Sequence, residues 1–359
     1  MAPHDTWMQR ALQLARLGTG GVAPNPMVGA VLAQGERILA EGWHKMPGGP
    51  HAEVECLHAF GEDPVPADAI MYVTLEPCTH HGRTPPCADL LIARGVKRVV
   101  VAHADPFPQV AGQGIQRLRD AGIEVTVGAC ADEARWTNRR FLTSVQHGRP
   151  YIILKWARSA DGFLDRHPRD GRNVQRIGSA ESDLHVHRWR SEEQAIMVGS
   201  NTVINDDPAL TVRHVAGRSP LRTVLDRGGR TPAGSQVFNT DAPTLLFTGA
   251  PRADVPAEQF VLGPDDDPLP RLMDEWHRRH VRSVLVEGGA TLLRQFLQRG
   301  LWDEARVIHG TPVFGQGTPA PPLPLMPVRS FASGPDHVHL YLHHGSSTAG
   351  TVPHPAWPW

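Results

Sequence analysis

The residues with the clearest chemical potential are one histidine and two cysteines in the first third of the sequence. His51 is followed by Ala52 and Glu53, and Pro77-Cys78 and Cys87 follow downstream, with eight residues between the two cysteines. Three His and Cys ligands leave the fourth tetrahedral position of a zinc ion to water, which is the arrangement of catalytic sites. Zinc makes hydroxide available near neutral pH, and hydroxide can attack an amidine-like ring carbon if a neighbour moves protons. Glu53 is placed for that role.

The local structure expected around these residues suits the chemistry. His51 and Glu53 should open a helix, so that one meets the metal while the other reaches toward the substrate. Cys78 and Cys87 should also lie near helix N-termini, whose partial positive charge favours thiolates. A His-x-Glu sequence with a later Pro-Cys and a second Cys is the signature of zinc deaminases, in which Glu is the general acid and base. Here the cysteine spacing is longer than in that signature.

A purely structural zinc site is the main alternative. It needs a fourth protein ligand, for which His80 and His81 are the nearest residues. A non-catalytic, zinc-stabilised binding protein of this kind would lose no function on Glu53→Gln. The remaining cysteines, Cys56 and Cys130, belong to no comparable cluster and are interpreted as buried or inert thiols.

Length, composition and charge favour a two-domain enzyme with a small-molecule substrate. A chain of 359 residues exceeds the usual size of a single core. With 36 Lys and Arg against 37 Asp and Glu, the chain has no basic excess for nucleic acid, so nucleic-acid deamination is disfavoured. No signal peptide or membrane segment is recognised, and four cysteines are too few for a disulfide framework. We therefore expect a cytoplasmic protein.

Hydrophobic patterning predicts a three-layer α/β domain over residues 1–148. Helices are expected at 6–17, after His51, at 88–94 and at 115–122, and strands at 27–33, 37–43, 69–78, 97–103 and 123–128. The first two strands read as a hairpin. A further helix from about 136 should run into a linker at Gly148 and Pro150.

A second α/β domain is predicted over residues 149–345, followed by a tail at 346–359. Its strands are expected at 151–157, 195–200, 222–226, 244–249 and 283–289, with helices at 181–190 and 291–300. The Pro-rich stretch 319–327 should be a surface loop.

The first domain resembles the deaminase half of the bifunctional diaminohydroxyphosphoribosylaminopyrimidine deaminase and phosphoribosylaminouracil reductase family. The resemblance rests on PCTHHGRTPPC, on the run Pro24–Gly29 and on HAE. The long cysteine spacing separates this family from cytidine and tRNA-adenosine deaminases, which share its fold. The resemblance implies a cytidine-deaminase-like domain in which zinc is bound by His51, Cys78 and Cys87, protons are moved by Glu53, and the substrate is contacted by Asn25 and His44.

The second domain resembles the reductase half of the same family, whose fold is similar to dihydrofolate reductase and whose cofactor is NADPH. The resemblance rests on three runs in order: Lys155–Gly162, 198–213 and Leu285–Gly289. No GxGxxG follows a strand, so a Rossmann fingerprint is absent.

Several residues of the reductase half can be assigned an expected role in binding or catalysis. Gly288 and Gly289 precede a helix, where phosphate can approach bare backbone N–H groups. Lys155 is the residue expected to polarise or protonate the sugar oxygen. The resemblance places the substrate at Arg190, Leu210, Arg213 and Glu287, and the cofactor at Ala157, Thr202 and Asp206 beside the two glycines.

Three positions depart from the family pattern. Phe107 stands where an Asn is expected in the deaminase half. In the reductase half, Arg176 lies in a run that is usually Trp-Ile-Thr, and Arg227 stands where Ser is common. The added arginines could bind cofactor phosphate. Alternatively the cofactor site is degraded, and the second domain of a deaminase would then serve only in nucleotide binding or oligomerisation.

The sequence therefore predicts a bifunctional enzyme of riboflavin biosynthesis. Its first step would be zinc-dependent deamination of a pyrimidine carrying a ribosyl phosphate, and its second the NADPH-dependent reduction of the ribosyl group. We also expect a homo-oligomer.

Overall fold

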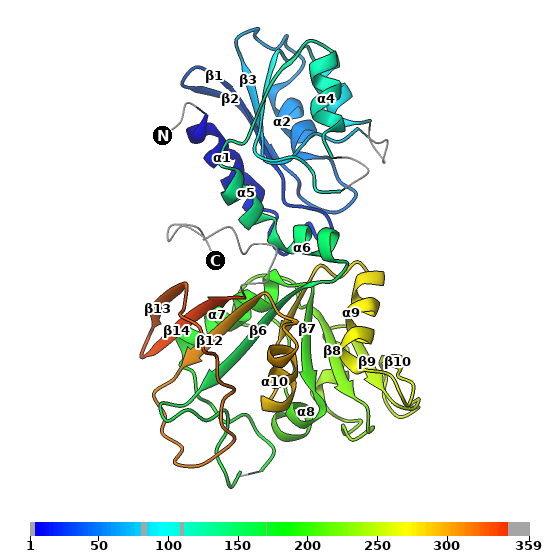
Figure 1. The fold of residues 1–359 in the computed structure, drawn as a ribbon, viewed down its shortest axis with the longest axis vertical. Coiled ribbons are helices and arrows are strands. Elements are labelled where there is room, and N and C mark those ends of the chain that lie inside the picture. Colours follow the sequence, from blue (N-terminus) through cyan, green and yellow to red (C-terminus); the bar gives the residue numbers. More distant parts are fainter. Residues whose placement is uncertain (1–3, 80–84, 108–110, 170, 344–359) are drawn as a thin grey trace. The chain divides into compact units, whose positions relative to one another are not determined.

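The computed structural model describes residues 4–79, 85–107, 111–169 and 171–343 (Figure 1). The chain divides into two compact units, one up to His147 and one from Gly148. None of the helices in the described ranges is long and apolar enough to cross a membrane.

The first unit is built on a five-stranded mixed sheet in the order β2-β1-β3-β4-β5 (Figure 1). β1 is antiparallel to both of its neighbours, and β3, β4 and β5 are parallel. The expected hairpin is confirmed. The strands are β1 (Gly29–Gln34), β2 (Arg37–Trp43), β3 (Ile70–Val73), β4 (Arg98–Val101) and β5 (Glu124–Val127).

Helices cover both faces of this sheet, which confirms the predicted three layers. One face packs on α2 (Ala52–Phe60), α3 (Cys87–Ala93) and α4 (Gln113–Asp120) through side chains such as Leu57, Leu91 and Leu118. The other face packs on α1 (Asp5–Arg16), and α5 (Ala131–Thr137) joins the same apolar cluster.

Three expectations for this unit are corrected. The strand expected at 69–78 ends at Val73, because the chain then turns away and carries Cys78 toward α3. The helix expected from about 136 is two helices, α5 and α6 (Arg139–His147), which meet at Asn138. β1 begins at Gly29 and not at Met27, because the backbone of Met27 pairs with the Asn138 side chain.

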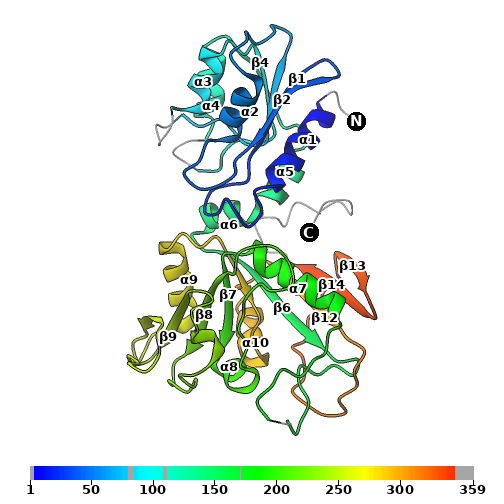
Figure 2. The same ribbon diagram turned by 180° about the vertical axis from the view of Figure 1, so that it is seen from behind.

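The second unit contains a nine-stranded sheet in the order β10-β9-β8-β7-β11-β6-β12-β14-β13 (Figure 2). The seven strands from β10 to β12 are parallel, and β14 and β13 add an antiparallel edge. The strands are β6 (Tyr151–Arg158), β7 (Ala195–Gly199), β8 (Leu221–Asp226), β9 (Thr244–Thr248), β10 (Glu258–Val261), β11 (Ser283–Val286), β12 (Glu304–His309), β13 (Arg329–Ser333) and β14 (Asp336–Leu342).

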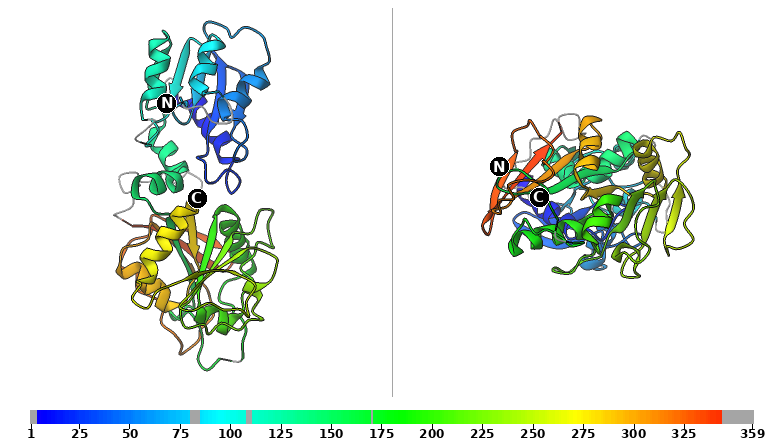
Figure 3. Two further views of the ribbon diagram at one scale, coloured as in Figure 1. Left: turned by 90° about the vertical axis from the view of Figure 1, so that its right-hand side faces the viewer. Right: turned by 90° about the horizontal axis from the view of Figure 1, so that it is seen from below.

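Helices pack on both faces of this sheet as well, as expected for a dihydrofolate-reductase-like domain. α9 (Pro268–Arg278) and α10 (Ala290–Gln298), yellow and orange in Figure 3, share one apolar core that includes Trp276 and Phe296. α8 (Ser200–Asp206) contributes Val203 to the core on the other side. The helix expected at 181–190 is α7 (Ala180–Glu192).

Candidate active sites

The three residues predicted to bind zinc come together in the first unit. His51 is the N-cap of α2, Cys87 is the first residue of α3, and Cys78 lies after β3. The Nδ1 atom of His51 is 3.2 Å from Cys87 Sγ and 3.6 Å from Cys78 Sγ, and the ligand atoms all lie within 4.8 Å of one another. Zn–S bonds near 2.3 Å and Zn–N bonds near 2.0 Å in a tetrahedron put N and S roughly 3.5 Å apart, so the cluster fits zinc.

The electrostatics of this cluster also favour a metal. A hydrogen bond from Cys87, helped by His51, lowers the pKa of the Cys78 thiol to about 4, which favours the thiolate. The Cys87 backbone N–H also donates to the Cys78 sulfur, at 3.4 Å. His80 and His81, the nearest residues for a fourth ligand, lie outside the described residues.

Glu53 lies beside the cluster, at the second position of α2, with its carboxyl group buried. Burial raises the pKa of Glu53 to about 7, and its side chain interacts with Cys87. A carboxyl group next to the ligands and outside the ligand set is where a proton-transfer group is needed.

Asn25 and His44 are hydrogen-bonded to each other, and His44 adjoins the cluster through its ring contact with His51. His44 Nδ1 is 2.9 Å from the Pro50 carbonyl oxygen, which only accepts, so Nδ1 carries the proton. His44 Nε2 then accepts from Asn25 Nδ2, at 3.0 Å. The His44 ring also meets the His51 ring edge-on, with centroids 5.6 Å apart. The carboxamide oxygen of Asn25 makes no bond in this chain of contacts and can face a ligand.

Glu76 anchors the segment that carries Cys78, a function that the sequence did not reveal. Its buried carboxylate accepts hydrogen bonds of 2.8–3.2 Å from the backbone N–H groups of Asp105, Gly112, Gly114 and Ile115. These bonds tie the end of β3 to the start of α4 and to the loop that carries Phe107, whose side chain is 41% exposed. A glutamate directly before Pro-Cys was the available signal.

The predicted reductase residues line one cavity of about 1000 Å³ in the second unit. The lining includes every residue expected there: Lys155, Ala157, Arg190, Thr202, Asp206, Leu210, Arg213, Glu287, Gly288 and Gly289. The structure thus brings together four separate stretches of sequence, from β6, α7, the β7–β8 region and β11.

Glu287 is the electrostatic centre of this cavity. Arg190 donates to both of its carboxylate oxygens, at 2.7 and 2.9 Å, and Lys155 Nζ lies 3.4 Å away. Burial raises the pKa of Glu287, but the charges of Arg190 and Lys155 outweigh it and hold the pKa at about 2. Arg190 also donates to the Thr211 carbonyl, while Arg213 donates to the Thr211 hydroxyl.

The end of the cavity where the cofactor is expected is lined by backbone without covering side chains at Gly288 and Gly289. Gly289 caps α10 without any side-chain hydrogen bond, and Gly288, Gly289 and Ala290 all line the cavity. A Cβ on Gly289 would be in ordinary van der Waals contact with Thr202 Oγ1, at 3.6 Å, so the residues expected at the cofactor are neighbours there. This cradle of helix N–H groups fits a diphosphate.

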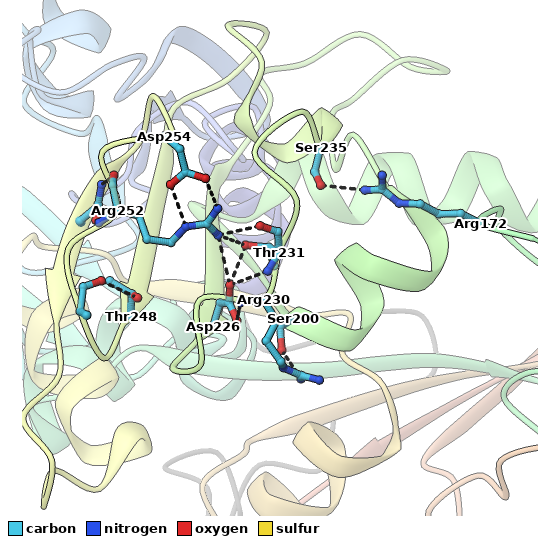
Figure 4. Close-up of polar contacts among 11 residues, drawn as sticks. Arg172, Ser200, Asp226, Arg230, Thr231, Ser235, Thr248, Arg252 and Asp254 are labelled. Atoms are coloured by element: carbon cyan, nitrogen blue, oxygen red, sulfur yellow. Dashed lines mark hydrogen bonds and ion pairs between the residues drawn. The ribbon is translucent and has the colours of Figure 1, made fainter.

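One wall of the cavity is a turn held by buried Asp226 (Figure 4). Its carboxylate accepts from the Arg230 and Thr231 backbone N–H groups, at 3.0 and 2.8 Å, and from the Thr231 hydroxyl. Arg230 in turn donates to Ser200 Oγ and Asn201 Oδ1 at the start of α8. Figure 4 also shows Arg172 donating to Ser235.

The two arginines that depart from the family pattern line the cavity but are engaged elsewhere. Arg227 donates to the carbonyl oxygens of Gly263 and Asp266, at 2.9 Å each. Arg176 forms an ion pair with Asp183 on α7. Each guanidinium already has its own partner, and neither disturbs the cluster around Glu287.

Sequence reasoning missed two further residues of the cavity. Arg169 pairs with Asp206, the residue expected at the cofactor. His187 accepts from the Arg213 backbone N–H at 3.0 Å. His187 precedes Arg190 by three residues, so helical periodicity could have found it. Arg169 lies in an irregular loop that gives no periodic signal.

Comparison with known proteins agrees with both sites. The chain matches the RibD C-terminal domain over residues 150–340 and the cytidine and deoxycytidylate deaminase zinc-binding region over residues 1–103. It is 42% identical to the riboflavin biosynthesis protein RibD of Aquifex aeolicus, over 87% of this chain and 88% of that protein. It is 40% identical to RibD of Escherichia coli, again over 87% and 88%.

Solved structures extend the match to the whole fold. A diaminohydroxyphosphoribosylaminopyrimidine deaminase/5-amino-6-(5-phosphoribosylamino)uracil reductase from Thermotoga maritima aligns with a TM-score of 0.85 at 35% identity, covering 94% of this chain and 97% of that one. Acinetobacter baumannii RibD aligns with a TM-score of 0.84 at 35% identity, covering 94% and 98%. The chain therefore belongs to the RibD family of bifunctional riboflavin-biosynthesis enzymes, which join a zinc-binding deaminase domain to an NADPH-dependent reductase domain.

Proposed function

We propose that this chain first deaminates 2,5-diamino-6-(5-phosphoribosylamino)pyrimidin-4(3H)-one and then reduces the ribosyl group of the product to give 5-amino-6-(5-phosphoribitylamino)uracil. The observation that carries the proposal is the presence, in one chain, of a His-Cys-Cys cluster beside a buried glutamate and of a cavity lined by the full set of expected reductase residues. The Thermotoga maritima relative is named for the same two activities.

In the deaminase site, each residue has one task. A zinc ion held by His51, Cys78 and Cys87 would supply Lewis-acid activation of water at neutral pH. Glu53 takes the proton from the attacking water and delivers it to the leaving amine, which departs as ammonia. Asn25 and His44 orient the pyrimidine beside them.

In the reductase site, the Glu287 cluster holds the reacting sugar. NADPH would supply the hydride, and its contacts would be with Ala157, Thr202, Asp206, Gly288 and Gly289. Lys155 gives a proton to the oxygen of the opened ribosyl group, while Glu287 keeps Lys155 and Arg190 in place. Arg213, together with Arg190, binds the sugar phosphate and Leu210 borders the ribose.

We also propose a cellular compartment, an oligomeric state and domain limits for the enzyme. Cysteine ligands must be reduced to bind zinc, so we place the protein in the cytoplasm, where thiols are kept reduced. We further propose a homo-oligomer, to be tested by light scattering on a sizing column. The domain limits proposed are 1–148 and 149–345, with 346–359 as a tail.

The test incubates purified, zinc-loaded protein with the diaminopyrimidinone ribosyl phosphate, with and without NADPH, and follows ammonia and NADPH absorbance separately. Ammonia release without NADPH, followed by NADPH loss once it is added, is the expected result. Ammonia without NADPH consumption would restrict the protein to deamination. No ammonia from zinc-loaded protein would overturn the proposal.

A further inference from the structure

The side chain of Asn138 acts as a substitute strand partner for Met27. Its Oδ1 atom accepts from the Met27 backbone N–H at 2.8 Å, and its Nδ2 atom donates to the Met27 carbonyl oxygen at 2.9 Å. The two residues are 111 positions apart in the sequence. A two-point contact of this kind fixes both the position and the orientation of the Met27 peptide groups.

Asn138 is itself held rigidly. It is 2% exposed and lies at the joint between α5 and α6. Its backbone N–H donates to Ala134 at the end of α5, and its carbonyl accepts from Leu142 in the first turn of α6. The joint is braced by Arg139, whose guanidinium lies 4.0 Å from the Trp136 ring centre. All four polar atoms of Asn138 therefore make hydrogen bonds.

The segment that Asn138 holds is the one that carries Asn25. Residues 24–27 lie between the end of α1 and the start of β1 and belong to no helix or strand. Within the described contacts of this segment, Asn25 is fixed by a backbone bond to Val22 and by its side-chain bond to His44. Met27 is held in addition by the Thr19 hydroxyl, which contacts its sulfur, and by the two hydrogen bonds to Asn138.

We infer that Asn138 is a positioning residue for substrate recognition by the deaminase, acting through the loop 24–27 on Asn25 and His44. The inference rests on the proposed role of Asn25 at the substrate. Asn138 touches no zinc ligand in the described contacts, so its effect falls on substrate affinity and not on metal binding. The joint between α5 and α6 thereby sets the geometry of a binding loop far away in the sequence.

The experiment measures deaminase KM and kcat for wild type, Asn138→Ala and Asn138→Asp, together with bound zinc and reductase activity on the deaminated product. Loss of two buried hydrogen bonds predicts a rise in KM of about 10-fold to 100-fold, with kcat changed by less than about 3-fold. Asn138→Asp keeps the size and the acceptor but replaces the donor by an oxygen facing the Met27 carbonyl, so its KM also rises. Zinc content and reductase activity stay at wild-type values.

The matched control is Thr137→Val, one residue earlier. Thr137 is also buried, and its hydroxyl has no hydrogen-bond partner among the described residues, so its loss leaves KM unchanged. In an Asn25→Ala background, Asn138→Ala should add little to KM, because the two residues act in series.

An unchanged KM in both Asn138 variants, or effects of Asn138→Ala and Asn25→Ala that simply add, would overturn the inference while leaving the proposed function intact. An equal loss of zinc or of reductase activity would also overturn it, because that pattern is general misfolding. A wild type that releases no ammonia would overturn the proposed function and this inference with it.

Discussion

Glu53 and His51 show how a single helix start can separate two tasks. His51 precedes the first turn of α2 and directs Nδ1 toward the cysteines, while Glu53 lies within that turn and is buried beside them. Because the two side chains leave the helix in different directions, the carboxyl group adjoins the metal cluster without belonging to it. The role proposed for Glu53 follows from this placement.

Replacing Glu53 by Gln should lower the rate of ammonia release by about 100-fold or more, because an amide cannot relay a proton. Bound zinc should remain at one ion per chain, since Glu53 is outside the ligand cluster. The measurement is ammonia production alongside metal analysis. Glu55→Gln, on the same helix and paired with Lys45, is the control and should retain the wild-type rate. Ammonia release at the wild-type rate by Glu53→Gln would show that Glu53 is not the proton-transfer group.

His187 makes the reductase unit sensitive to acid. Burial, with smaller contributions from Arg190 and other neighbouring charges, lowers its pKa from 6.5 to about 4. The folded protein keeps His187 neutral between these values, whereas the unfolded chain binds a proton. The contribution of neutral His187 to stability is therefore fully present above about pH 6.5 and is lost as the pH falls toward 4.

The expected result is a lower melting temperature at pH 5 than at pH 7.5, and a smaller decrease in His187→Asn. Protonation would place an N–H donor against the Arg213 N–H, which explains the loss. His280→Asn is the control, because His280 is exposed and its φ of 57° suits Asn. If His187→Asn shows the same pH dependence as wild type, His187 is not the responsible group.

At the level of elements, the start of α4 is pressed against the peptide that precedes a zinc ligand. A Cβ added to Gly114 would lie 1.9 Å from the Pro77 carbonyl oxygen, so only glycine allows this approach. The same contact is reinforced by Glu76, whose carboxylate accepts hydrogen bonds from the backbone N–H groups of Gly114 and Ile115. Helix α4 and the Cys78 segment are thus fixed to one another by packing and by hydrogen bonds.

Gly114→Ala should weaken zinc binding, because the helix start or the Pro77-Cys78 peptide must move. We expect at least a 10-fold loss of zinc affinity, which is within the range seen when groups that orient metal ligands are changed. The measurement is competition with a chromophoric chelator. Gly21→Ala is the control, since its Cβ would meet atoms only at ordinary distances of 3.5 Å and beyond. Equal affinities in the two variants would contradict the prediction.

Sequence patterning located most elements of the first unit but missed several of the second, including the amphipathic helix α9 and the strands β10, β12, β13 and β14. The strand at 37–43 was predicted with its exact bounds, because its ends are marked by turn residues and its hairpin partner is adjacent. Helix α8 was missed, since only seven residues follow β7 before the chain turns at Asp207. The break at Asn138 could not be foreseen, because it depends on a partner 111 residues away.

Among the residues of the candidate sites, some could be identified from the sequence and others only from tertiary contacts. His51, Cys78 and Cys87 could be read from their types and spacing, because metal ligation leaves few alternatives. The Arg190–Glu287 pair could be placed at the site only by resemblance, since nothing local indicates that the two residues meet. Asn138 was not identified because it acts on backbone groups of a distant segment, which leaves no pattern in the sequence. Glu76 was marked only by its place directly before Pro77-Cys78.

For the whole molecule, the two candidate sites are built from separate sets of residues. The zinc cluster uses residues up to Cys87, and the reductase cavity is lined by residues from Lys155 to Thr318. These sets belong to different compact units. Among the described residues, none of the three in the metal cluster lines the reductase cavity.

Removing the metal should therefore abolish one activity and spare the other. After dialysis against a strong chelator, ammonia release should vanish, while oxidation of NADPH with the deaminated substrate should stay within about 2-fold of its original rate. Added zinc should restore ammonia release. A parallel loss of NADPH oxidation, reversed by zinc, would show that the reductase depends on the metal site.

The two hydrogen bonds between Asn138 and Met27 limit how far the deaminase unit can be truncated from its C-terminal end. A fragment that stops at residue 103, where the match to the deaminase zinc-binding region ends, would keep every metal ligand yet lose the amide that holds the loop before β1. It would also lose Gly114 and the backbone N–H groups through which Glu76 fixes the Cys78 segment, so it should bind zinc weakly as well as turn over poorly at low substrate concentration. An independently useful deaminase has to retain α5 and α6, up to the last residue before the reductase begins.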